Sequence, residues 1–155
     1  MDVFLDSPQD FGNLCLLSRT LEALGVRRCY VHDLNRLIRP RYGKSRTRQI
    51  KTISAGAFFH VAFKRVEEPE AFLAALSGRK VATVPDQRVT PLPNFAFRPD
   101  DIVVFGSEGH GIRPEVLALC DERVTIPQHG VTDSLNLAVS VGIVLFEFFR
   151  QAPTS

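Results

Sequence analysis

Three short segments of the 155-residue chain combine glycine with polar side chains in patterns that suit ligand binding and catalysis. They are residues 12–19, 105–111 and 126–136. Glycine lets a backbone approach a ligand closely, while amide, carboxylate, hydroxyl and guanidinium groups can orient a substrate. Each segment alone also has an ordinary structural explanation, in which its polar residues cap helices or lie in solvent. The segments therefore have to be considered together with the fold that positions them.

The segment 105–111 contains three glycines, Gly106, Gly109 and Gly111, between an expected strand and an expected helix. Such a loop can bring backbone N–H groups close to a ligand. The glycine fingerprint of NAD and flavin proteins follows the first strand, where this chain has Ser-Pro-Gln-Asp at residues 7–10. The pattern therefore indicates a ligand loop of another class, in which Glu108 is either functional or a surface carboxylate.

The other two segments contribute amide, guanidinium and hydroxyl groups. Asn13 is expected near the start of a helix, and Arg19, six residues later, does not share its helix face closely. Ser134 is well placed to cap the N-terminus of the final helix. Asn136 is expected inside that apolar helix, where its amide needs a buried partner. On spacing alone, a helix cap and a surface charge explain Asn13 and Arg19.

Strand-like and helical patterns alternate along the whole chain. The expected strands are residues 3–5, 29–31, 57–63, 80–84, 101–105 and 123–126, and the expected helices are residues 10–24, 48–53, 68–76, 114–120 and 134–149. This alternation predicts an α/β fold with a mostly parallel six-stranded sheet and helices on both faces. Ligands bind such sheets at the carboxyl ends of the strands. The loops at 84–86, 106–111 and 127–133 are therefore the expected ligand loops.

Positive charge is concentrated in residues 27–51. This segment has nine basic residues against the single acidic Asp33, a net charge of +8 in a chain whose total is +2. Most of the basic residues are arginines, whose forked guanidinium suits bidentate contact with phosphate. The segment is either a solvated loop without a partner or a surface that binds a polyanion. The candidate contacts are Arg36, Arg39, Arg41, Lys44, Arg46 and Arg48.

The composition argues against several other classes of protein. No apolar run is long enough for a membrane span, and no basic stretch precedes an apolar run at the N-terminus, so we expect a cytoplasmic location. Cys15, Cys29 and Cys120 show no CxxC spacing and are expected to be structural. The four histidines show no ligand spacing, so no metal site is expected.

The segments FGNLCLLSRTLEALGV, IVVFGSEGHGI and IPQHGVTDSLNLAVSVGIVLFEFFRQ, in this order and at this spacing, resemble the three motifs of the SpoU/TrmH family. This is a family of RNA 2′-O-ribose methyltransferases in the SPOUT superfamily. Ser-Ala-Gly-Ala at residues 54–57 also resembles a stretch between its first and second motifs. The resemblance implies one methyltransferase domain over residues 1–155, with a C-terminal trefoil knot. Because the chain begins directly at the first expected strand, we expect no extra N-terminal RNA-recruiting domain.

The same resemblance implies an activity. The chain is expected to transfer a methyl group from S-adenosyl-L-methionine to a ribose 2′-OH of tRNA or rRNA, as a homodimer whose active site is completed across the interface. The residues implied in catalysis are Asn13, Arg19, Glu108, Ser134 and Asn136. The residues implied in cofactor binding are Thr83, Val84, Pro85, Phe105, Gly106, Glu108, Gly109, Gly111, Ile126, Gln128, Ser134, Leu135 and Asn136.

Some alternatives remain open at this level. Arg19 either activates the hydroxyl as a base or only positions it, since a guanidinium normally stays charged. Residues 137–149 are apolar on nearly every face, which indicates a dimer contact or a monomeric core helix. The main alternative function is a non-catalytic RNA- or nucleotide-binding module on the same fold.

Overall fold

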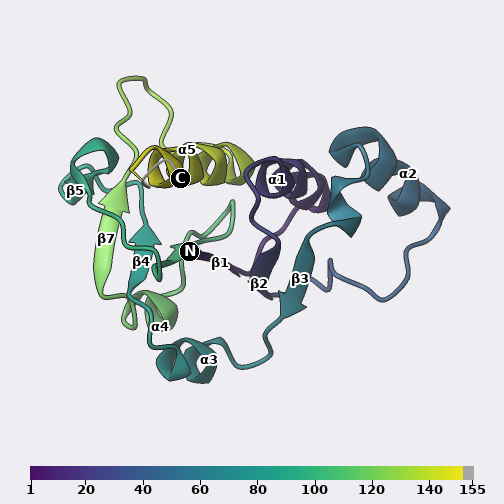
Figure 1. The fold of residues 1–155 in the computed structure, drawn as a ribbon, viewed down its shortest axis with the longest axis horizontal. Coiled ribbons are helices and arrows are strands. Elements are labelled where there is room, and N and C mark those ends of the chain that lie inside the picture. The colour runs from purple at the N-terminus through teal and green to yellow at the C-terminus, as the bar shows by residue number, and fades with distance from the viewer. Residues whose placement is uncertain (152–155) are drawn as a thin grey trace.

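A parallel β-sheet forms the centre of the protein, whose structure is a computed structural model describing residues 1–151 (Figure 1). The strand order is β3-β2-β1-β6-β4-β7-β5, and every neighbouring pair is parallel. Residues 152–155 of the expected domain lie outside the described residues. The predicted α/β class and the parallel sheet are therefore confirmed.

The chain alternates between strands and helices as expected. The strands are β1 (Asp2–Asp6), β2 (Arg28–His32), β3 (Ala62–Arg65), β4 (Lys80–Thr83), β5 (Thr90–Pro91), β6 (Ile102–Phe105) and β7 (Glu122–Thr125). The helices are α1 (Phe11–Ala23), α2 (Lys44–Ser54), α3 (Pro69–Ala75), α4 (Pro114–Leu117) and α5 (Leu137–Gln151), with 3-10 turns η1 (Ala57–Phe59) and η2 (Leu92–Asn94).

Helices cover both faces of the sheet. In Figure 1, α1, α2 and α5 lie on one side and α3 and α4 on the other. The central strand β1 serves both sides, because successive side chains of a strand point in opposite directions. Val3 and Leu5 join the larger apolar cluster under α1 and α5, while Phe4 joins the smaller cluster with Leu73 of α3 and Val116 of α4. Both faces of the central strands are thus buried, which explains their continuous apolar sequences.

The structure differs from the sequence-based expectation at two places in the sheet. The sheet has seven strands rather than six, because Thr90–Pro91 within the proline-rich loop pairs with β7. The expected strand at 57–63 was wrong over its first half, where the chain forms η1, and only Ala62–Arg65 pairs with β2. Ala55 and Gly56 adopt left-handed backbone angles that turn the chain sharply after α2. This turn directs Phe58 into the core instead of along the sheet.

Candidate active site

A cavity of about 460 Å³ opens at the carboxyl ends of β4, β6 and β7, where ligands bind parallel sheets. Its volume lies in the range typical of small-molecule sites. Three loops form its walls, and they are the loops that the sequence singled out. The cavity is lined by twelve of the predicted cofactor residues: Thr83, Val84, Pro85, Phe105, Gly106, Glu108, Gly109, Gly111, Ile126, Gln128, Ser134 and Leu135. Of that predicted set, only Asn136 does not line it.

The loop after β6 is held in a tight turn by its own backbone. Ser107 and Gly111 exchange two N–H to carbonyl hydrogen bonds of 3.0 Å each, and Gly111 has a positive φ of 69°. A Cβ atom added at Gly106 would lie 2.0 Å from the carbonyl carbon of Gly111. Glycine is therefore required at position 106 because two stretches of backbone pass at the closest possible approach.

Polar side chains from three distant segments meet beside this cavity. The Asn13 amide nitrogen donates to a Glu108 carboxylate oxygen at 2.8 Å, and the Asn136 amide nitrogen donates to the Asn13 amide oxygen at 2.9 Å. The Glu108 carboxylate also accepts from the backbone N–H of Gln9 at 2.9 Å, just before α1 begins. A carboxylate at this position stabilises free N–H groups and the positive end of the helix dipole. The Glu108–Asn13–Asn136 chain thus ties the start of α1 to the second and third motif loops.

Asn136 and Ser134 occupy different positions from those expected. The final helix α5 begins at Leu137, so the prediction that Asn136 lies inside the helix was wrong. Its side-chain oxygen accepts from the backbone N–H of Ala138 at 2.9 Å, which is the geometry of an N-cap. Ser134 is therefore not the cap. It lies in the exposed loop before the helix and lines the cavity.

Arg19 lies outside the cavity. Its side chain is exposed on α1, and within residues 1–151 it makes no hydrogen bond or ion pair. It follows Leu16 by one helical turn on the same exposed side of α1. The structure of one chain thus brings Asn13, Glu108 and Asn136 together and leaves Arg19 apart from them.

The ion pair between Asp6 and Arg113 anchors the far end of the glycine loop. Asp6 ends β1 with a fully buried carboxylate, which accepts from the Arg113 backbone N–H at 2.9 Å and from its Nε at 2.9 Å. The His32 ring nitrogen Nδ1 lies 3.2 Å from the same carboxylate. A buried carboxylate is stable only with such partners. The sequence analysis did not single out Asp6 or Arg113, because nothing local indicates that residues 107 positions apart will meet.

The predicted RNA-contacting residues surround α2 and the loop before it. Arg36, Arg39, Arg41, Lys44 and Arg48 are exposed. Arg46 is different, since its guanidinium stacks 4.6 Å from the centre of the Phe11 ring and donates to the Leu37 carbonyl at 3.3 Å. We infer that Arg46 mainly holds α2 against α1, while the other five present charge to solvent.

None of the three cysteines lines the cavity. Burial raises the pKa of the Cys15 thiol to about 11 and that of Cys120 to about 11, and it raises the pKa of Cys29 further. All three are free, and their raised pKa values keep them protonated near neutral pH. Within residues 1–151 no group of three or more His, Cys, Asp or Glu side chains is arranged to hold a metal ion.

The comparison with known protein families agrees with this arrangement of motifs. The sequence profile of the SpoU rRNA Methylase family matches residues 1–146. The chain belongs to the SpoU rRNA methylase family. Two of the three loops that line the cavity, residues 105–111 and 126–135, lie in segments that carry the family resemblance.

Two curated relatives of this SpoU-family chain act on different RNAs. It is 28% identical over 152 residues to the tRNA (guanosine(18)-2′-O)-methyltransferase of Aquifex aeolicus, covering 96% of this chain and 68% of the relative. It is 31% identical over 152 residues to the 23S rRNA (guanosine-2′-O-)-methyltransferase RlmB of Acinetobacter baylyi, covering 95% of this chain and 58% of the relative. Both relatives are longer than the part that this chain matches.

A solved structure of the family carries the expected cofactor. The SpoU methyltransferase AviRb of Streptomyces viridochromogenes, in complex with AdoMet, superimposes with a TM-score of 0.77 at 26% identity. The match covers 97% of this chain and 60% of AviRb.

No helix in the part of our SpoU-family chain that the structure describes is long and apolar enough to cross a membrane.

Proposed function

We propose that this chain is an S-adenosyl-L-methionine-dependent methyltransferase that methylates a ribose 2′-OH in tRNA or rRNA. The observation that carries the proposal is the cavity at the carboxyl ends of β4, β6 and β7, which the second and third motif loops line together with the loop at residues 83–85. AviRb, a relative with the same fold, was solved with AdoMet. The two curated relatives methylate guanosine ribose in tRNA and in 23S rRNA, so both RNA classes stay within the proposal. An RNA substrate is also compatible with the expected cytoplasmic location.

The residues of the cavity fit the cofactor. The Thr83 hydroxyl oxygen at the cavity is buried and has no hydrogen-bond partner among the described residues, so a polar ligand group would satisfy it. Backbone of Gly106–Gly111 and the apolar side chains of Ile126 and Leu135 would hold the rest. The bound cofactor supplies an activated methyl group on a positively charged sulfur.

The protein's polar side chains position the reactants and stabilise the charge that develops during methyl transfer. Methyl transfer to a hydroxyl is an in-line displacement, so alignment of the two reactants supplies much of the rate. The Glu108–Asn13–Asn136 chain fixes the two motif loops around the cavity. Ser134 lines the cavity and can orient the hydroxyl or the cofactor. Arg19 contacts the target phosphate or hydroxyl and favours loss of the hydroxyl proton.

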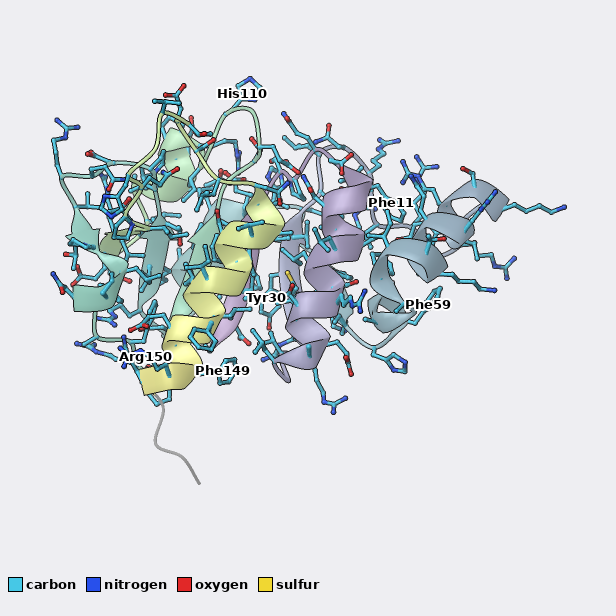
Figure 2. The ribbon with its side chains drawn as sticks, turned by 90° about the horizontal axis from the view of Figure 1, so that it is seen from above. Phe11, Tyr30, Phe59, His110, Phe149 and Arg150 are labelled. Atoms are coloured by element: carbon cyan, nitrogen blue, oxygen red, sulfur yellow. The ribbon has the colours of Figure 1, made fainter. Side chains whose placement is uncertain are left out.

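The proposal includes a homodimer that completes the active site. Val139, Ile143 and Phe146 form an exposed apolar stripe along α5, and Leu16 extends it onto the neighbouring α1. Figure 2 looks directly onto this layer, in which α5 and α1 lie side by side. An apolar surface of this kind is typical of a protein interface. Arg19 lies beside Leu16 and therefore borders this surface, and the proposal is that it acts at the partner's cavity.

The proposal also includes the C-terminal trefoil knot. Strand β4 lies between β6 and β7 in the sheet although it precedes both in the chain. The final helix α5 then returns across the sheet to pack against α1. This strand order and the return of α5 support a threaded C-terminal segment, which is an exception to the usual absence of knots.

The activity is tested directly by incubation of the purified protein with labelled S-adenosylmethionine and total RNA, followed by nucleoside mapping. The expected result is label on one 2′-O-methylated nucleoside in tRNA or rRNA. Binding of both RNA and cofactor without any transfer would support the alternative, a non-catalytic module. Label on a base instead of a ribose would contradict the proposed acceptor.

Replacing Gly106 with alanine is expected to weaken S-adenosylmethionine binding by roughly 5- to 100-fold, because the new methyl group collides with backbone that cannot rotate away. Isothermal titration calorimetry measures the change. Gly109→Ala is the matched control, since its methyl group would meet only the end of the Gln9 side chain, at 3.0 Å. Equal loss in both variants would contradict this account of the loop.

The Glu108–Asn13–Asn136 chain predicts energetic coupling between two distant residues. Asn13→Ala and Asn136→Ala should each lower the free energy of unfolding by about 1 kcal/mol. The double variant should lose less than the sum of the two, by roughly 0.5–1.5 kcal/mol, because both remove the same hydrogen bond. Urea denaturation of the four proteins measures the cycle. Strictly additive losses would show that the hydrogen bond contributes nothing.

A further inference from the structure

A second hollow lies beside the edge strand β3 and shares no residue with the cofactor cavity. Its volume is about 530 Å³, and we refer to it as the aromatic hollow, defined by Tyr42, Phe58, Phe59 and Phe63. Arg39 and Arg41 from the basic segment form part of its wall. Proteins that bind single-stranded nucleic acid typically stack its bases on aromatic rings and contact its phosphates with basic side chains such as arginine.

The four aromatic rings of the hollow pack against one another, and the Phe59 ring is the most exposed of them. Phe58 is buried, and its ring centre lies 5.7 Å from that of Tyr42 and 4.9 Å from that of Phe63. Phe59 meets the Phe58 ring edge-on, with centres 6.2 Å apart, yet it is 61% exposed. Phe58 therefore serves the core, whereas Phe59 presents most of its ring to solvent. The left-handed turn at Ala55 and Gly56 places both residues.

The charge beside the hollow is not neutralised by the protein. Arg39 and Arg41 make no ion pair with any acidic side chain in the described chain, residues 1–151. The nearby acidic residue of this segment, Asp33, is buried and accepts from the backbone N–H groups of Leu37 and Ile38. The Arg39 backbone N–H in turn donates to the Tyr42 hydroxyl at 3.0 Å, which fixes this ring against the loop. The hollow thus combines flat apolar rings with free positive charge.

These features favour RNA over a second copy of the chain as the occupant. A symmetric contact between two copies through this surface would bring the same arginines close together, and like charges oppose such a contact. An RNA strand carries both a flat base and flanking phosphates, so it matches the rings and the arginines at once. Single exposed phenylalanines are common on protein surfaces. Phe59 differs because it lines a hollow that also contains Arg39 and Arg41.

We propose that the aromatic hollow binds an unpaired base of the RNA substrate, stacked on Phe59, with Arg39 and Arg41 contacting the neighbouring phosphates. This inference rests on the proposed RNA methyltransferase function. Figure 2 shows Phe59 far from His110, which belongs to the loop lining the cofactor cavity. The stacked base is therefore not the nucleotide that the cavity of the same chain methylates, and it selects and orients the RNA rather than reacting.

Two RNA probes test the proposal by fluorescence anisotropy with the full chain. One is a single-stranded oligoribonucleotide, and the other has the same length and backbone but no bases. Phe59→Ala should weaken binding of the first probe by about 5- to 100-fold and leave binding of the second unchanged. Phe59→Tyr, which keeps the ring, should bind both probes like the wild type. Leu34→Ala is the matched control, because Leu34 is equally exposed in the same basic segment but lies outside the hollow.

Salt dependence separates the roles of the rings and the arginines. Arg41→Ala should weaken both probes and reduce the slope of log affinity against log salt by about 0.7, since one phosphate contact is lost. Phe59→Ala should leave that slope unchanged. S-adenosylmethionine binding should be unchanged in Phe59→Ala, which establishes that the fold and the cofactor cavity are intact.

Several outcomes would overturn the proposal. Equal affinity of Phe59→Ala and wild type for the base-bearing probe would remove the stacking role, as would equal weakening of both probes. A changed sedimentation coefficient of Phe59→Ala with unchanged RNA affinity would make the hollow a contact between copies. Failure of the wild type to bind any RNA would instead reject the proposed function itself.

Discussion

Replacing Arg19 with alanine is expected to lower the rate of methyl transfer by roughly 10²- to 10⁴-fold while S-adenosylmethionine binding stays unchanged. Groups that stabilise charge or assist proton loss in a transition state contribute effects of this size. Cofactor binding should survive because Arg19 lies outside the cavity and is not hydrogen-bonded to its walls. Single-turnover kinetics with labelled cofactor measure the rate, and calorimetry measures binding.

Two further variants make this result specific. Arg19→Lys keeps the charge but loses the forked donor, so it should recover only part of the activity. Arg28→Ala is the control, because Arg28 is also an exposed arginine but lies at the amino end of β2, whereas the cavity lies at the carboxyl ends of the strands. Wild-type transfer by Arg19→Ala would reject the role of Arg19. Loss of cofactor binding in that variant would place Arg19 in the cavity instead.

Mixed dimers reveal whether Arg19 acts on its own cavity or on the partner's. At a cofactor concentration too low to saturate Gly106→Ala, Arg19→Ala and Gly106→Ala should each show little activity alone. If Arg19 acts across the interface, a co-expressed mixture should regain about a quarter of the wild-type activity. Half of randomly paired dimers then contain one site with an intact cavity and an intact Arg19. No recovery would place Arg19 and its cavity in the same chain.

Replacing Phe146 with aspartate is expected to convert the proposed dimer into a monomer and to abolish methyl transfer. Phe146 is 65% exposed, the highest exposure in the apolar stripe on α5, so pairing would bury two carboxylates without partners. The monomer should remain folded, because the side chain contributes little to the core. Analytical ultracentrifugation measures the mass, circular dichroism the fold, and the transfer assay the activity.

Leu34→Asp provides the matched comparison, since Leu34 is 63% exposed but belongs to the basic segment and not to this stripe. That variant should remain a dimer. A fully active Phe146→Asp monomer would show that one chain holds a complete site. A wild-type monomer at assay concentrations would reject the dimer proposal before any substitution is tested.

Much of the fold was predictable from local patterns. The run Ile102–Phe105 is continuously apolar because β6 is buried on both faces, and the sequence analysis placed this strand within one residue. The helix α1 ends close to Gly25, whose positive φ of 74° suits glycine. At residues 57–61 the Phe- and Val-rich pattern predicted a strand, but packing of the aromatic side chains into the core produced a 3-10 turn instead. Phe58 belongs to the core cluster with Phe11, not to the sheet.

The sequence by itself thus determined the α/β class, the three loops and the family to which they belong. Only the tertiary structure decided that Glu108, Asn13 and Asn136 form one hydrogen-bonded chain, that Asn136 caps α5 and that Phe59 borders a charged hollow. The physical reason is that periodicity records which side of a helix or strand is buried, which is a local property. The meeting of polar groups about a hundred residues apart depends on the order of strands in the sheet. The local sequence of the loops does not specify the order of the strands, so the relative positions of the loops are known only from the folded structure.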